Sequence, residues 1–328
     1  MQLHRLAALL VAAAAAAPAA AQDPSFNPAI SVILDGAYHD DGRERGFELR
    51  EIEIVLSSAI DPYFDGVAAF AIADGEIEVE EAFVTTRALP AGLAVKAGKF
   101  LSDVGYVNAQ HPHAWLFADR PLVSERLFGE HGLQDTGVQV AWVPATPLYT
   151  RFGVEALQGD DEANGPRLFT AFAKAAPDLG FDHALQAGVF GGRASGDARL
   201  WGADVVYKHD AGGAAGKGAF VAQAEYARRT RDLGVLTDTQ DGYYAQAVYG
   251  FARRWSAGVR VDHVGRGDVQ GSARRATVMV AWRPTEFSRL RLQFARADEA
   301  LETGVRERFN QLFLQWQVSL GAHGAHAF

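Results

Sequence analysis

The chain has 328 residues, a net charge of −9 and no cysteine. Without cysteine it cannot use disulfides, so its stability must come from hydrogen bonding and burial. The acidic balance argues against nucleic acid as a partner, because nucleic-acid binding favours a basic face. Beyond the first residues, no apolar run reaches the length of about eighteen that a transmembrane helix needs, so we predict none in the mature chain.

The amino-terminal residues have the pattern of a secretory signal peptide. Arg5 precedes an apolar run over 6–17, and small alanines follow that run. The run is too short for a spanning helix with these flanks, although a retained anchor helix is the alternative. We predict a cleaved leader at 1–21 and a single barrel domain at 22–328.

Segments with a hydrophobic period of two recur through the rest of the chain. Sixteen ranges fit such strands: 29–39, 46–58, 63–73, 76–87, 92–101, 135–143, 148–158, 167–175, 181–191, 198–208, 218–229, 242–253, 255–264, 274–283, 286–297 and 309–328. Alternating faces over this many segments are typical of strands with lipid on one side and a wet lumen on the other. The predicted fold is all-β: a transmembrane antiparallel up-and-down β-barrel of about 16 strands, within a range of 14 to 18.

The connections between these segments alternate in character. Every second connection along the chain is, in most cases, short and rich in proline, as at 60–62, 144–146 and 284–285. The connections between them are mostly longer polar loops. The stretches 210–218 and 73–75 break the trend. Because bacterial barrels have short periplasmic turns and longer outside loops, the pattern places the amino terminus in the periplasm.

One connection, 102–134, is more than thirty residues long and has no strand pattern. Loops of this length are usually functional, and its load of aromatic and charged side chains argues against disorder. We therefore expect it to fold into or over the lumen, where Arg120 and Arg126 would pair with lumen acids.

Charged side chains fall on the strand faces opposite the apolar rows. Arg289 and Arg291 alternate with Leu290 and Leu292, for example. Because sixteen strands leave an aqueous passage, these charges predict a pore. Early strands are acidic and later ones basic, which indicates either a transverse field or scattered solvated charge. The predicted pore and constriction residues are Trp115, Arg120, Glu125, Arg126, Arg151, Arg260, Asp262, Arg289, Arg291, Glu51 and Glu53.

Histidines in the long loop suggest a metal site. His111 and His113 are two residues apart and can reach one ion, and His131 or Glu130 could complete the set. Hydrogen bonds that hold the loop in the barrel are the alternative role for these side chains. Zinc is the candidate ion, and we expect no other cofactor.

The last predicted strand, 309–328, shows the alternation most clearly and ends on Phe328. This terminal aromatic resembles the one that bacterial outer-membrane barrels present to the barrel-assembly machinery, which we therefore predict as a partner. We expect the strand to close the barrel against the first strand, and its alternation splits His323 and His326 onto opposite faces.

Four stretches carry a family resemblance: GYVNAQHPHAWLFADRPL (105–122), GEHGLQDTGVQVAWVP (129–144), WRPTEFSRLRLQFA (282–295) and SLGAHGAHAF (319–328). The chain resembles a proteobacterial group of outer-membrane proteins labelled zinc-regulated or TonB-dependent-receptor-like, and more loosely the porins. The resemblance implies an outer-membrane β-barrel linked to zinc or another scarce solute. TonB-dependent receptors carry a folded amino-terminal plug, for which this chain leaves no room before its first predicted strand, so passive diffusion is the simpler mechanism.

These observations predict a passive outer-membrane channel for small hydrophilic solutes or ions, narrowed by the 102–134 loop. The alternatives are a receptor that captures a metal ion through the loop histidines, and an outer-membrane enzyme. The chain has neither a GxSxG nor an HExxH motif, so we predict that it is not an enzyme. The expected partners are outer-membrane lipid, the solute and, as a possible homo-oligomer, further copies of the chain.

Overall fold

The computed structural model describes residues 28–321, apart from 74, 130, 160–166, 196–197, 268, 270 and 301–304. The predicted leader and the residues after Gly321, including His323, His326 and Phe328, lie outside this range. No helix in the described part of the chain has the length and apolar character needed to cross a membrane.

The described chain forms sixteen strands: β1 (Ala29–Asp40), β2 (Arg45–Ala59), β3 (Phe64–Ala73), β4 (Glu76–Thr86), β5 (Leu93–Leu101), β6 (Gln134–Trp142), β7 (Tyr149–Leu157), β8 (Leu168–Ala176), β9 (His183–Arg193), β10 (Arg199–His209), β11 (Phe220–Asp232), β12 (Thr237–Ala252), β13 (Trp255–Val264), β14 (Ala273–Thr285), β15 (Ser288–Ala300) and β16 (Arg306–Gly321). The helical segments are α2 (Leu122–Phe128) and the 3-10 turns η2 (Pro90–Gly92), η3 (Pro112–Ala114) and η4 (Ala214–Gly216).

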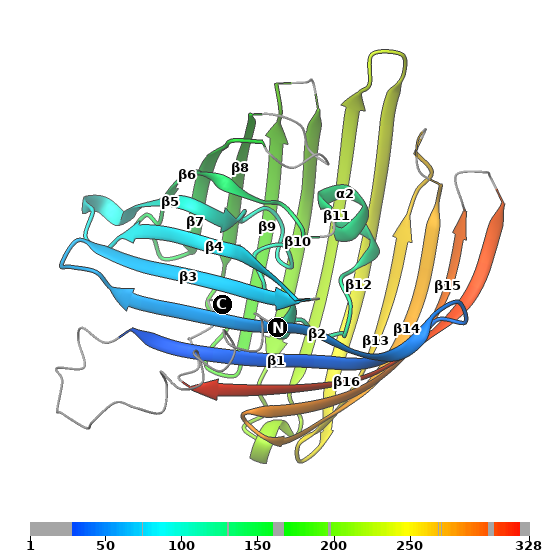
Figure 1. Cartoon of the computed structure of the whole chain (residues 1–328). Helices are drawn as coiled ribbons and strands as arrows, with labels where there is room; N and C mark the ends of the chain where they lie inside the picture. The colour runs from blue at the N-terminus through cyan, green and yellow to red at the C-terminus, as the bar shows by residue number, and fades with distance from the viewer. Residues whose placement is uncertain are drawn as a thin grey trace, which may run out of the picture.

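Each strand pairs antiparallel with its neighbours in sequence, and β16 pairs with β1, so the sheet is a closed barrel (Figure 1). The predicted fold and the predicted closure are therefore confirmed. Leu34 opposes Val318 in the closing pair. Gly36 opposes Trp316, and a side chain at Gly36 would overlap the indole ring, so glycine makes room for the tryptophan.

Residues on the two faces of the barrel wall differ in exposure, as the alternation predicts. Val278, Val280 and Trp282 are exposed on the outside of β14, whereas the intervening Met279 and Ala281 are buried toward the interior. A closed barrel satisfies its strand hydrogen bonds within the sheet, which is why such a wall can stand in lipid without cysteine crosslinks.

Some strand boundaries differ from the expectation. β12 begins at Thr237, five residues before the predicted 242, because its polar first residues continue the ladder with the end of β11. The last strand is described only as far as Gly321, whose φ of 91° interrupts the extended backbone.

Candidate functional site

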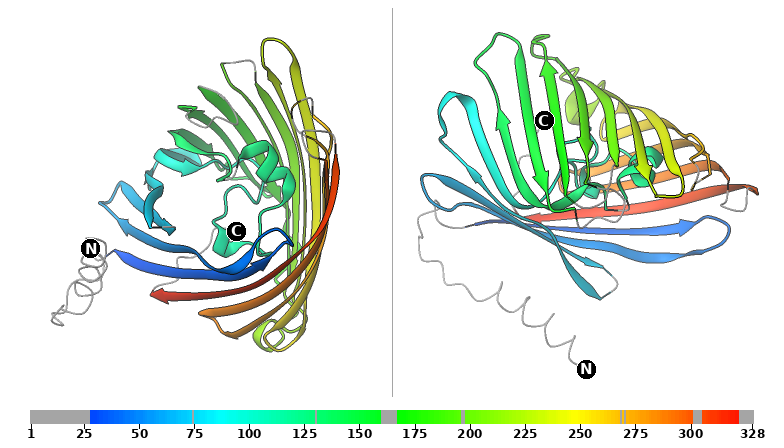
Figure 2. Two further views of the ribbon diagram at one scale, coloured as in Figure 1. Left: turned by 45° about the vertical axis from the view of Figure 1, so that its right-hand side comes forward. Right: turned by 90° about the horizontal axis from the view of Figure 1, so that it is seen from above.

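The connection between β5 and β6 turns into the barrel and lies inside the wall, with α2 near strands β11 and β12 (Figure 2). We call residues 102–133 the inner loop. Pro112 and Pro121 stand at the starts of η3 and α2, and Gly129 ends α2 with a φ of 91°. Proline suits the first turn of a helix and glycine its end, so these residues fix the path of the loop.

A hydrophobic core fills the space between the inner loop and one side of the wall. Val104, Val107 and Leu127 of the loop are almost completely buried and belong to one cluster with Phe190 and Tyr244 of the wall. Burying one large apolar side chain contributes roughly 1.5–3 kcal/mol. The lumen on this side is therefore packed with protein.

Arginines of the later strands hold the loop by ion pairs to Asp119. Nη2 of Arg260 lies 2.8 Å from Oδ1 of Asp119, and Nη1 of Arg275 lies 2.8 Å from its Oδ2. Burial would raise the pKa of Asp119, but the two guanidinium groups outweigh it and hold that pKa well below its usual range. Arg260 also contacts Asp262 at 2.9 Å and lies 4.8 Å from the ring of Phe117.

Other arginines bind backbone carbonyls of the loop. Arg289 donates to the carbonyl of His113 at 2.8 Å, and Arg291 donates to that of Trp115 at 3.2 Å. Arg50 of β2 donates to the carbonyl of Ala118 at 2.7 Å. In the described part of the chain no carboxylate forms an ion pair with Arg289 or Arg291, so the loop carbonyls are their main partners.

Acidic residues of the early strands hold the loop through its histidines. Nε2 of His111 lies 2.9 Å from Oε2 of Glu81, and its Nδ1 lies 3.3 Å from Oε2 of Glu80. Nδ1 of His113 lies 2.6 Å from Oε2 of Glu53. Burial lowers the pKa of His111, but hydrogen bonds to Glu80 and Glu81 outweigh it, so the pKa is raised well above its usual value.

A β-bulge brings Glu80 and Glu81 to the same side. Ala69 opposes Glu81 and the next residue, Phe70, opposes Val79, so Glu80 is the extra residue in β4. Strict alternation would send the two carboxylates to opposite faces, but the bulge directs both toward His111. The sequence prediction missed this pair because the bulge depends on the register between β3 and β4.

A third group of contacts fixes the start of the loop, and sequence reasoning also missed it. Glu155 of β7 is buried and accepts hydrogen bonds from the backbone N–H of Asp103 at 3.0 Å and from Gln139 at 2.7 Å. Arg151 pairs with Asp103 at 2.7 Å. The inward position of these wall residues was predictable, but their partners depend on the path of the loop.

The predicted constriction residues differ in burial and in their partners. Arg260, Asp262 and Arg291 of the wall are buried beneath the loop, and Arg120 of the loop itself is also buried. Arg120 stacks on Trp115 at 4.8 Å rather than pairing with a lumen acid. The predicted pairing with lumen acids fits Arg126, which lies 3.0 Å from Glu299, while Glu125 is exposed. Arg151, Arg289, Glu51 and Glu53 lie on the wall beside the loop.

The structure changes the predicted metal set. Glu53, Glu80 and His111 each offer a ligand atom, and these atoms lie within 4.8 Å of one another. The ring of His113 stacks on that of His111, with 5.8 Å between centroids, but His131 is exposed and is not in this group. Sequence spacing identified His111 but could not supply the two carboxylates, which come from strands β2 and β4.

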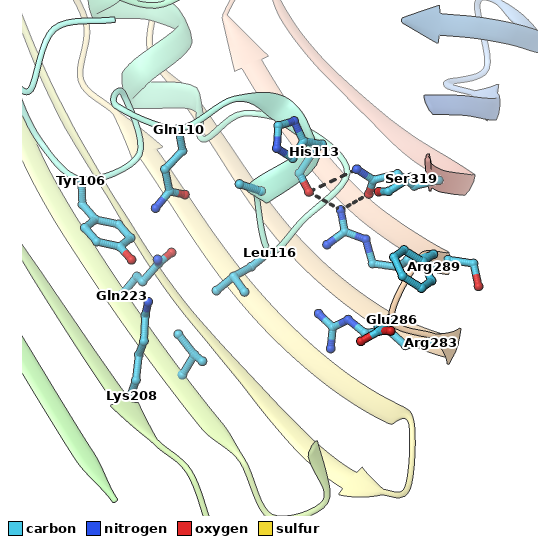
Figure 3. Close-up of a pocket in the computed structure, with 15 residues that line it drawn as sticks. Tyr106, Gln110, His113, Leu116, Lys208, Gln223, Arg283, Glu286, Arg289 and Ser319 are labelled. Carbon is cyan, nitrogen blue, oxygen red and sulfur yellow. Dashed lines mark hydrogen bonds between the residues drawn. The ribbon is translucent and has the colours of Figure 1, made fainter. Parts of the chain in front are cut away.

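Two cavities flank the inner loop at the end of the barrel where β1 begins and β16 ends. The larger, of about 470 Å³, lies between Lys208 on one side and Arg283 and Arg289 on the other (Figure 3). The second, of about 340 Å³, is lined by Lys96, Arg151 and Lys174 among others. Tyr106 and Gln110 of the loop line both cavities. We call the larger cavity the vestibule.

The fold is shared with bacterial outer-membrane channels and porins. OmpT of Vibrio cholerae, in a trimer form, has a TM-score of 0.64 and 11% identity, with 90% of this chain and 99% of that chain covered. The outer-membrane channel DcaP of Acinetobacter baumannii has a TM-score of 0.60 and 13% identity, covering 90% and 96%. An anion-selective porin from Comamonas acidovorans has a TM-score of 0.62 and 10% identity, covering 90% and 99%. The chain has the closed sixteen-strand, porin-like β-barrel fold of these bacterial outer-membrane proteins.

A protein of Aquifex aeolicus (strain VF5), described as uncharacterized, is 31% identical over 387 aligned positions, which cover 93% of this chain and 80% of the relative. The chain belongs to the same family as that protein. No protein-family model matches the chain. The zinc-regulated and TonB-dependent-receptor-like label stays a prediction.

Proposed function

We propose that this protein is a passive channel for small hydrophilic solutes or ions, and that the inner loop narrows its lumen. The observation that carries the proposal is the anchoring of the loop inside a closed sixteen-strand barrel by three separate parts of the wall. A loop held at several points forms a fixed constriction. The similarity to a channel and to a porin supports transport rather than catalysis.

Conductance across planar bilayers tests this function. Refolded protein should form discrete open channels, and a variant in which a short Gly-Ser linker replaces 103–132 should have a larger conductance per channel. Equal conductance in both forms would contradict the constriction. If neither form conducts, although both fold as judged by heat-dependent gel mobility, the channel itself is refuted.

A second candidate function is the capture of a divalent metal ion, with zinc as the first choice. Glu53, Glu80 and His111 supply one imidazole and two carboxylates where the loop meets β2 and β4, a donor set that zinc accepts. His111 must lose its proton to bind, so the affinity should rise with pH. His113 lies beside the group and is a candidate for a fourth ligand.

Isothermal titration with zinc chloride tests the metal function. We expect saturable binding that His111→Ala abolishes and that His131→Ala, the exposed histidine of the same loop, leaves unchanged. Absence of binding, or equal effects of the two substitutions, would remove this function without affecting the channel.

Two partner proposals accompany the channel. The trimer form of the Vibrio cholerae neighbour supports assembly of this chain into a homo-oligomer, which light scattering of the detergent-purified protein would measure. A monomeric mass would refute it. We also retain the barrel-assembly machinery as a partner, recognised through the strand that leads to Phe328. Deletion of Phe328 should lower the yield of assembled barrel in the outer membrane, and an unchanged yield would contradict it.

A further inference from the structure

The vestibule has an excess of cationic side chains. Lys208, Arg283 and Arg289 line it, and Glu286 is the one carboxylate among its lining residues. Figure 3 shows Lys208 on one side of Leu116 and the two arginines on the other. A solute with negative charge at both ends could therefore contact both sides.

The hydrogen-bond partners of Arg289 carry no negative charge. It donates to the carbonyls of His113 and Trp115 and to the side-chain oxygen of Gln317, and all these acceptors are neutral. No ion pair involves Arg283 or Arg289 in the part of the chain that the structure describes. Guanidinium groups bind carboxylate and phosphate oxygens well, often with two parallel hydrogen bonds.

In the second cavity, by contrast, the cationic side chains already have partners within the protein. Its Arg151 forms an ion pair with Asp103 at 2.7 Å, and its Lys174 donates to the carbonyl of Gly105 at 3.0 Å. Asp103 and Glu81 add negative charge to its lining. The vestibule is therefore the better anion site of the two.

The remaining lining suits a small organic molecule. Gln223, Gln317 and Ser319 add neutral polar groups, while Val221 and Phe287 add apolar surface. The volume of about 470 Å³ falls within the range of small-molecule sites. An inorganic anion would use the charge but not the apolar surface.

From these observations we propose that the vestibule is a binding site for small organic anions with two or more carboxylate or phosphate groups, which makes such anions the preferred solutes of the channel. This inference rests on the proposed channel function. Arg283 and Lys208 bind the solute, whereas Arg289 both holds the loop and supplies charge.

Arg283→Gln is the variant that tests the site, because the side chain of Arg283 contacts no described residue through a hydrogen bond or ion pair. Arg253→Gln is its control, since Arg253 is exposed at the same end of the barrel and does not line the vestibule. Both substitutions remove one positive charge. Heat-dependent gel mobility should show that both variants fold.

The probes are citrate, fructose 1,6-bisphosphate and uncharged glucose, added to the vestibule side of single channels. Citrate and fructose 1,6-bisphosphate should interrupt the current and glucose should not. Arg283→Gln should weaken the interruption about ten-fold, as expected for loss of one charge-assisted hydrogen bond, and Arg253→Gln should leave it unchanged. Equal effects of the two substitutions, or equal interruption by glucose, would overturn the proposal.

Titration calorimetry of the detergent-purified protein separates this inference from the channel function. Citrate binding that is about ten-fold weaker in Arg283→Gln supports the site even if no current is observed. Current without any citrate binding overturns the site and leaves the channel intact.

Discussion

The inner loop meets two opposite kinds of wall. On β2 and β4 the wall is acidic, and the loop contributes histidines, with His111 against Glu80 and Glu81. On β13 to β15 the wall is basic, and the loop contributes Asp119 and backbone carbonyls. Arginine keeps its charge at all ordinary pH values, whereas histidine does not. The contacts that hold the loop on the basic side therefore keep their charge, whereas those on the acidic side depend on pH.

The largest expected effect comes from breaking the basic side. Asp119→Ala would remove one of the two carboxylates that the buried Arg260 and Arg275 share and would leave Asp262 as their other partner, which should cost about 3 kcal/mol of stability. Urea unfolding followed by tryptophan fluorescence measures this loss. In the control, Asp65→Ala removes an exposed pair with Arg87 and should change stability little. Similar losses in the two variants would show that Asp119 does not hold the loop.

A smaller effect should come from the acidic side. His111→Ala removes charge-assisted hydrogen bonds to Glu80 and Glu81 and should cost about 2 kcal/mol near pH 6. Limited proteolysis of the loop would report the weaker anchoring. His209→Ala, at a half-buried histidine outside the loop, is the matched control. The comparison fails if the two variants are cleaved at the same rate.

The smallest expected effect is a pH dependence of the loop contacts, confined to the acidic side of the wall. Because the pKa of His111 is raised in the folded protein, its contribution to stability is fully present below the pKa of an unfolded histidine and is lost as pH rises through the folded pKa. The pKa of Asp119 is lowered, so its contribution is present above the pKa of an unfolded aspartate and is lost only as pH falls through its folded pKa.

Raising the pH from about 7 to above the folded pKa of His111 should therefore increase current noise from the loop, while the Asp119 contacts persist. Single-channel recording over this range measures the effect. His111→Gln should remove the pH dependence of the noise. A wild-type channel with constant noise across the range would contradict the pH-dependent side.

Local alternation explains why so much of the barrel was predictable. Neighbouring residues such as Leu290 and Arg291 show which face of a strand is apolar and which is polar. Closure then requires only that the first and last strands pair with each other. The contacts of the inner loop depend instead on groups far apart in sequence. Asp119 and Arg260 are brought together only by the path of the loop, and Glu80 reaches His111 only because a bulge shifts β4.

The same reasoning explains where the packing of the loop differs from the sequence expectation. Histidine spacing pointed to His131 as a third ligand, but η3 and α2 separate it from His111 and leave it exposed. Arg120 was expected to pair with an acid, yet it stacks on Trp115. The local sequence pattern could not predict either position, because both depend on how the loop packs in three dimensions.

The position of the loop in the conduction path can be measured directly, because the chain has no native cysteine. Gln110 lines both cavities, so a cationic methanethiosulfonate reagent attached to Gln110→Cys should reduce the current of an open channel in single steps. The same reagent on Gly234→Cys, in the exposed connection between β11 and β12, should leave the current unchanged. Confirmed labelling of Gln110→Cys without any change in current would contradict a channel narrowed by its inner loop.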